Sequence, residues 1–184
     1  QIIQTSIGGG NARVSALGVA STIASLSQIK NSMYPKIPFL LKKNNNKPVM
    51  YKKENFISEE DSMAAQIVLS GLEKTLFPET ADWKGVGTAS SAFARTFDKI
   101  CGYSCPVKGK TGTVSFQDKN HKGTTLFGGL TDIKQLADLI DRNVKIQGYE
   151  SVAIGVIASE KGASDVTNRA ADMHMKLLKY IFFD

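Results

Sequence analysis

The sequence predicts an α+β fold in which an antiparallel sheet is packed by helices. Three β-favouring runs, at residues 107–116, 124–130 and 151–159, fall in the second half of the chain, after two segments with helical spacing of apolar residues. Helices and strands therefore do not alternate, which argues against a doubly wound parallel sheet. Because three strands with a nearly continuous apolar run need covering, we expect further strands and helices of this fold outside the chain.

Two longer helices are expected in the first half of the chain. Ser15 precedes a run whose apolar residues recur at helical spacing, and its hydroxyl is suited to cap that helix. Ser58 precedes the acidic residues 59–61, a pattern typical of a capped helix start. The apolar face of this second helix is expected to hold Ala64, Ile67, Val68, Gly71 and Leu72.

Three more helices are expected later in the chain. A short one runs through Phe93 and Phe97, and Thr131 is placed to cap a second one that ends near Asp141. A closing helix is expected from about Ser164. The apolar face of the closing helix is expected to hold Val166, Ala170, Met173, Leu177 and Ile181.

Length and composition are those of one soluble globular domain or part of a larger one. The chain has 184 residues, a net charge of +6, and no visible signal peptide or long apolar segment. Its lysines concentrate in residues 42–53, without the interleaved aromatic residues or motifs of nucleic-acid-binding proteins. We interpret this tract as a solvated loop, with contact to an anionic surface as the alternative, and expect no nucleic-acid partner.

Cys101 and Cys105 are the only cysteines, and they stand four residues apart. The two histidines, His121 and His174, lie at no usual zinc spacing from them, so we expect neither a metal nor a cofactor. One interpretation of the cysteines is a short-loop disulfide in an oxidising compartment. The other is a pair of reduced thiols.

The segment around Lys110 carries the clearest chemical signal. It combines a lysine, two threonines and glycines inside a β-favouring run, so a strand edge there can present an ammonium, hydroxyls and close-approaching backbone to a carboxylate. A phosphate loop is not expected. That pattern needs a glycine where Ser104 stands, and it needs a following helix rather than a strand.

Four segments occur in the order found in penicillin-binding proteins, the D,D-transpeptidases of peptidoglycan synthesis. They are Ser6-Ile7-Gly8-Gly9-Gly10 with the helical run after it, Gly87-Thr88-Ala89, Gly109-Lys110-Thr111-Gly112-Thr113, and Phe127-Gly128-Gly129-Leu130. The resemblance covers roughly residues 6–184. Residues 1–184 therefore resemble the C-terminal half of a penicillin-binding transpeptidase domain.

This resemblance implies a penicilloyl-serine transferase fold, with residues 110–113 on the strand that lines an acyl-transfer cleft. Lys110 would supply positive potential near the catalytic serine and the substrate carboxylate. The hydroxyls of Thr111 and Thr113 would bind that carboxylate, and the backbone N–H of Thr113 would be one oxyanion donor. Gly112 would let the substrate backbone lie against the strand.

The same resemblance implies the biological setting. The partners would be a D-Ala-D-Ala stem peptide, β-lactams and the remainder of the transpeptidase domain, with no cofactor. The location would be the cell envelope, at the outer face of the cytoplasmic membrane or in the periplasm, with any membrane anchor outside this chain.

The chain departs from the family pattern at the nucleophile. Family members place Ser-x-x-Lys and Ser-x-Asn before the segment that begins here at Ser6, but this chain has no Ser-x-Asn, and Ser27-Gln28-Ile29-Lys30 lies after it. We interpret that match as a coincidence. Acyl transfer needs a nucleophile, a base and oxyanion donors, so we expect an active serine-type parent protein and an inactive isolated chain. We also expect the chain to expose apolar faces that the missing part would cover.

Two other functions stay open. The domain could have lost its chemistry and serve as a scaffold or sensor of the cell envelope. Upstream Ser-x-x-Lys and Ser-x-Asn would favour the enzyme, and their absence the binding module. A serine β-lactamase shares the fold and the Lys-Thr-Gly strand, but the segments at Ser6 and at Gly87-Thr88-Ala89 are more similar to those of the transpeptidases.

Overall fold

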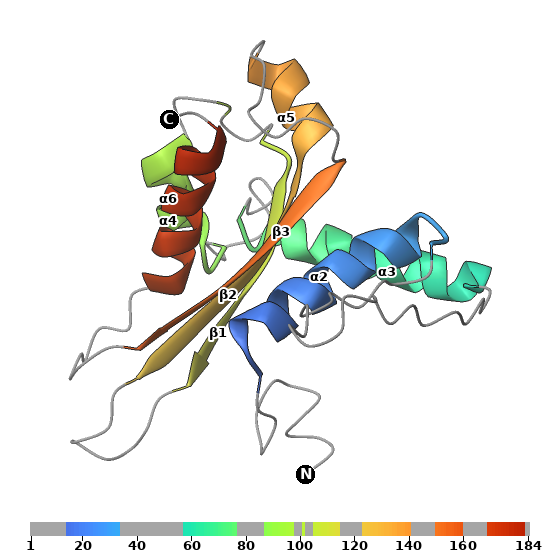
Figure 1. Cartoon of the computed structure of the whole chain (residues 1–184), viewed down its shortest axis with the longest axis horizontal. Coiled ribbons are helices and arrows are strands. Elements are labelled where there is room, and N and C mark those ends of the chain that lie inside the picture. The colour runs from blue at the N-terminus through green and yellow to red at the C-terminus, as the bar shows by residue number, and fades with distance from the viewer. Residues whose placement is uncertain are drawn as a thin grey trace, which may run out of the picture.

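The chain forms an α+β fold with a three-stranded antiparallel sheet between helices, as the sequence predicts (Figure 1). This computed structural model describes residues 14–33, 57–76, 87–97, 101, 105–114, 123–140, 150–159 and 169–182. The helices are α2 (Ala16–Lys30), α3 (Glu59–Lys74), α4 (Ser90–Phe97), α5 (Ile133–Ile140) and α6 (Arg169–Phe182). The strands are β1 (Val107–Val114), β2 (Thr124–Asp132) and β3 (Ser151–Ser159).

The sheet has the order β1-β2-β3, and both pairs are antiparallel. Figure 1 shows α2 and α3 on one side of this sheet and α4 and α6 on the other. The predicted Ser6 segment, the last two residues of the predicted first strand, and the predicted start of the closing helix at Ser164 lie outside the described residues. No helix within the described ranges is long and apolar enough to cross a membrane.

The two predicted N-terminal caps are confirmed. The hydroxyl of Ser15 accepts a hydrogen bond from the N–H of Gly18 at 3.0 Å, and that of Ser58 accepts one from the N–H of Asp61 at 3.1 Å. Each bond satisfies a backbone donor that the first helical turn leaves without a partner. The short helix through Phe93 and Phe97 is also present as α4.

The predicted cap of α5 is wrong by one residue. Asp132, not Thr131, caps this helix: its Oδ1 accepts from the N–H of Gln135 at 2.9 Å. Thr131 is fully buried in β2, which extends past the predicted end at Leu130. The reason is that the ladder continues on both sides of β2, where Thr131 lies between Val107 and Val152.

The predicted apolar face of α3 is wrong in most positions, although Leu72 is buried as expected. Ile67 and Val68 are exposed, as are Ala64 and Gly71. The helix instead buries Ser62, Ala65, Leu69 and Leu72. A long-range hydrogen bond favours this rotation, because the hydroxyl of Ser62 donates to the carbonyl of Lys30 at 2.8 Å and turns this side toward α2.

The predicted apolar face of α6 is also displaced. Met173 and Leu177 are exposed and Ile181 is partly buried, whereas Ala170 is buried as expected. The buried side consists of Ala170, Ala171, His174, Met175, Leu178 and Phe182. This helix carries apolar residues on two sides, so spacing alone did not show which side packs on the sheet.

Glycines on the sheet let the helices approach closely. Gly128 and Gly155 are paired across β2 and β3 and face α2. A β-carbon at Gly128 would lie 2.5 Å from a methyl carbon of Val19, and one at Gly155 would meet the backbone carbonyl of Ala16. On the other face, the hydroxyl of Thr125 accepts from the N–H of Ala170 at 3.2 Å and anchors the first turn of α6 on β2.

His174 is completely buried between α6 and the sheet. Its ring meets the ring of Phe127 edge-on, with centroids 4.7 Å apart, and fills the space left by the missing side chain of Gly129. Burial lowers the pKa of His174 to about 4, and the nearby backbone of Ile154 opposes this shift. We regard burial as decisive, because no described residue makes a hydrogen bond of good geometry to either ring nitrogen.

This burial predicts acid sensitivity. The unfolded chain binds a proton at His174 below pH 6.5, whereas the folded chain does so only near pH 4. The contribution of the neutral His174 to the free energy of unfolding is therefore fully present above pH 6.5 and is lost as the pH drops toward 4. The loss is about 3 kcal/mol by the usual conversion of pKa to free energy. Urea denaturation of the wild type and of His174→Phe across this range measures the loss. The titration of the carboxylates, which both proteins share, cancels in the difference between their free energies of unfolding. Parallel curves for the two proteins would contradict the prediction.

Candidate functional site

Residues 110–113 lie in the middle of β1, which is an edge strand among the described residues. β1 pairs with β2 along its whole length, and its other edge has no strand partner in this part of the chain. An edge strand presents alternate N–H and C=O groups that a ligand can pair with. The predicted site is therefore on a strand with one open edge.

The register decides which backbone groups reach that edge. Asp132 donates its N–H to the carbonyl of Pro106 at 3.1 Å, so this pair is hydrogen-bonded. Hydrogen-bonded and non-hydrogen-bonded pairs alternate along an antiparallel ladder. It follows that Lys110 and Gly112 pair with β2, while the N–H and C=O groups of Thr111 and Thr113 point to the open edge.

The side chains alternate between the two faces of the sheet. Lys110 stands opposite Gly128 on the face that carries α2, whereas Thr111 stands opposite Phe127 on the face that carries α6. Lys110 and Thr113 are exposed and Thr111 is buried. The ammonium of Lys110 returns to the strand edge, because its Nζ donates to the carbonyl of Thr111 at 2.7 Å.

Thr88 is a residue of this site that the sequence did not reveal as one. Its hydroxyl lies 2.8 Å from that of Thr111, at hydrogen-bond distance. The sequence of Gly87-Thr88-Ala89 resembles a family segment, but nothing in that pattern shows that it contacts β1. The turn that holds Thr88 is fixed to the end of α3, because the N–H of Ala89 donates to the carbonyl of Thr75 at 3.1 Å.

Gly112 has a packing reason to lack a side chain. A β-carbon there would lie 2.7 Å from Cγ of Leu126, the residue opposite it on β2. The space above Gly112 is therefore occupied by the protein itself. This contact accounts for the glycine without a bound substrate.

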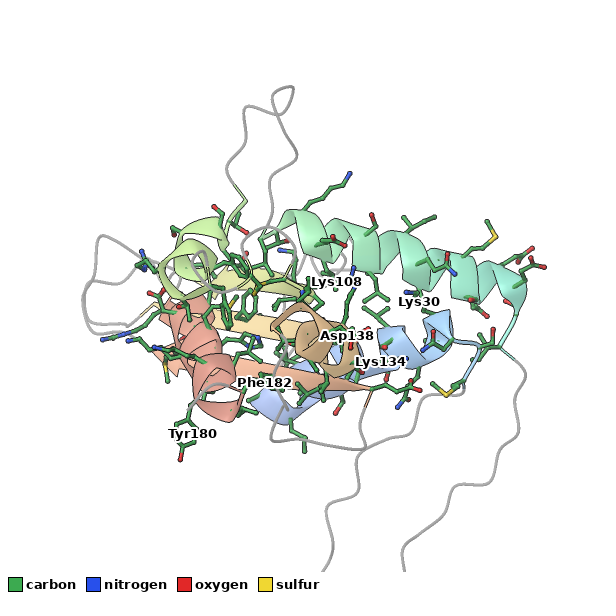
Figure 2. The ribbon with its side chains drawn as sticks, turned by 90° about the horizontal axis from the view of Figure 1, so that it is seen from above. Lys30, Lys108, Lys134, Asp138, Tyr180 and Phe182 are labelled. Atoms are coloured by element: carbon green, nitrogen blue, oxygen red, sulfur yellow. A yellow bond between two sulfur atoms is a disulfide. The ribbon has the colours of Figure 1, made fainter. Side chains whose placement is uncertain are left out.

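A hollow of about 430 Å³ opens at the beginning of β1, away from residues 110–113. It is lined by Glu73, Cys105, Pro106, Val107, Lys108, Gln135 and Leu139. Lys108 and Glu73 form a partly exposed ion pair here, with Nζ and Oε2 2.5 Å apart. Figure 2 shows Lys108 on the side of the fold where α5, with Lys134 and Asp138, also lies.

Cys101 and Cys105 form a disulfide, with their α-carbons 5.1 Å apart. Cys101 continues the end of α4, since its N–H donates to the carbonyl of Phe97 at 3.1 Å, and Cys105 lies just before β1. The bridge therefore ties α4 to the start of the candidate strand. No group of three or more potential ligand side chains is arranged to hold a metal ion in the described ranges.

The arrangement can bind an anionic, extended ligand along the β1 edge. It offers outward N–H groups at Thr111 and Thr113, the ammonium of Lys110, and the exposed hydroxyl of Thr113. The hydroxyl of Thr111 is less accessible because it is buried and already paired with Thr88. Compared with known proteins, the chain matches no family model, no curated protein and no solved structure.

The Thr88–Thr111 hydrogen bond predicts a graded effect of substitution. Thr88→Val leaves the buried hydroxyl of Thr111 without this partner and is expected to lower the free energy of unfolding by about 1 kcal/mol. Thr88→Ser keeps the hydroxyl and should lose less. Urea denaturation measures both, with Thr113→Val at an exposed position as a control expected within about 0.5 kcal/mol of the wild type. Equal losses for the valine and serine variants at Thr88 would argue against the bond.

Proposed function

We propose that this chain is the C-terminal half of a penicillin-binding D,D-transpeptidase domain. Its β1 edge would bind the carboxylate and the acyl carbonyl of a D-Ala-D-Ala stem peptide, or of a β-lactam. The observation that carries the proposal is the position of the Lys-Thr-Gly-Thr segment: it lies on an open strand edge with the N–H of Thr113 directed outward. The order of the four sequence segments supports it.

The reaction begins when a serine outside this chain attacks the acyl carbonyl of the stem peptide. The serine oxygen forms a bond to the carbonyl carbon, and negative charge develops on the carbonyl oxygen. The Thr113 N–H stabilises that charge, and losing one such donor typically costs about 10²–10³ in rate. The peptide bond to the terminal D-alanine breaks as a base outside this chain passes the serine proton to the leaving nitrogen. The amine of a second stem peptide then attacks the acyl carbon, and the serine oxygen leaves and regains a proton.

Lys110 assists through its charge. Its ammonium is exposed at the strand edge and donates to the backbone carbonyl of Thr111, so it can turn toward an incoming carboxylate. An ammonium near a carboxylate both attracts the substrate and orients it. Thr113, which is exposed on the same strand, would add a hydroxyl donor to that carboxylate.

The exposed side of α3 supports the view that this is half of a domain. Met63 and Ile67 are 57% and 71% exposed, and their i, i+4 spacing makes them neighbours on the outer side of the helix. Val68, which is 46% exposed, lies at the flank of this side. A stripe of this kind on a soluble domain usually marks a surface that another element covers. We propose that the remainder of the transpeptidase domain, which would bring the nucleophile and base, covers it in a protein of the cell envelope.

The alternative is an inactive transpeptidase-like scaffold or sensor. One contact favours it: the hydroxyl of Thr111, a proposed carboxylate donor, is buried and already paired with Thr88. A strand kept for its packing rather than for its chemistry would show this arrangement.

Labelling with a fluorescent penicillin decides between the two. We expect the parent protein, with the residues that precede Gln1, to be labelled and the isolated chain to stay unlabelled. Lys110→Ala in the parent should slow labelling about 10²-fold or more, because it removes charge from the acyl-transfer site. Lys134→Ala, at an exposed position on α5, is the matched control and should label normally.

If the folded parent protein is not labelled while a penicillin-binding control is, the enzyme hypothesis is rejected and the scaffold or sensor hypothesis remains. Rapid nitrocefin hydrolysis by the parent would instead identify a β-lactamase.

A further inference from the structure

A second apolar stripe runs along the outer side of α6. Met173, Leu177 and Tyr180 are spaced at i, i+4 and i+7, so they lie one above another on the helix. They are 45%, 43% and 70% exposed, while the opposite side of α6 packs on the sheet. Figure 2 shows Tyr180 projecting away from the rest of the fold.

The charges around this stripe are mainly basic. Lys176 and Lys179 are exposed and follow the same outer side of the helix. The helix has one acidic residue, Asp172, and its Oδ1 pairs with Nη2 of Arg95 at 2.5 Å. The outer side of α6 therefore combines three apolar side chains with a local excess of positive charge.

The comparable stripe on α3 has the opposite electrostatic setting. There Met63 and Ile67 follow the exposed acidic residues 59–61 in the first turn. The two helices also lie on opposite faces of the sheet (Figure 1). A single surface that covers α3 would thus leave α6 uncovered, and an anionic surface would attract α6 but not the first turn of α3.

We propose that the outer side of α6 docks on an anionic lipid surface. Met173 and Leu177 would enter the boundary between headgroups and acyl chains, with the helix lying parallel to the membrane plane. The ring of Tyr180 suits the same depth, because its body is apolar and its hydroxyl can stay among the headgroups. Lys176 and Lys179 would meet the lipid phosphates.

This inference depends on α6 alone and not on the proposed acyl transfer. A protein surface is a less fitting partner, because the stripe is small and its flanking lysines match the diffuse negative charge of lipid headgroups. An interfacial helix needs only a shallow apolar face and basic flanks, both of which α6 has.

The test is co-sedimentation of the 184-residue chain with lipid vesicles. We expect binding to phosphatidylcholine vesicles that contain about one third phosphatidylglycerol, little binding to phosphatidylcholine alone, and weaker binding as salt rises. Each of Lys176→Gln and Lys179→Gln should lower the partition coefficient on anionic vesicles about 5-fold. The double variant Leu177→Ser/Tyr180→Ser should lower the partition coefficient further.

The matched control is the double variant Met63→Ser/Ile67→Ser on α3, which should bind anionic vesicles like the wild type. Circular dichroism of every variant checks that α6 and the sheet stay folded. Failure of the wild-type chain to bind anionic vesicles would overturn the proposal. So would unchanged binding by the α6 variants, since the attraction would then come from elsewhere, such as the lysines of residues 42–53.

Sedimentation velocity covers one more outcome. If the wild-type chain is a dimer that does not bind vesicles, and the double variant Leu177→Ser/Tyr180→Ser is a monomer, the stripe is a self-association surface and the lipid proposal is overturned. None of these results depends on penicillin labelling, so the two proposals fail separately.

Discussion

The hydrogen-bond pairing of β1 with β2 is the constraint on which the candidate site depends. In this register Lys110 and Gly112 are hydrogen-bonded to β2, and the backbone N–H and C=O groups of Thr111 and Thr113 point to the open edge. A slip of one residue would exchange these roles and move every side chain to the other face. The chemistry proposed for the strand therefore follows from its register more than from its composition.

Several contacts outside the ladder support that register. The disulfide between Cys101 and Cys105 fixes the start of the strand to α4, and Thr88 holds its middle through Thr111. Beside β1, Gly128 of β2 and Gly155 of β3 let α2 lie directly on the sheet, while Thr125 of β2 anchors α6 on the opposite face. A sheet supported on both faces can keep one edge open without losing its shape.

The sequence predicts those structural features that depend on residues close together along the chain. The caps at Ser15 and Ser58 and the existence of all three strands follow from local patterns and are confirmed. The predicted buried side is wrong in most positions of α3 and at Met173 and Leu177 of α6, because each helix has apolar residues on more than one side. Contacts such as the hydrogen bond of Ser62 to Lys30 select between these sides. The partnership of Thr88 and Thr111 joins residues 23 positions apart, which no local pattern encodes.

Amide hydrogen exchange in β1, followed by NMR, tests this register most directly. We expect slow exchange for the N–H groups of Lys110 and Gly112, which pair with β2, and fast exchange for those of Thr111 and Thr113 at the open edge. Equal protection along the strand, or the reverse alternation, would contradict it, because Thr113 would then have no N–H free to receive an oxyanion.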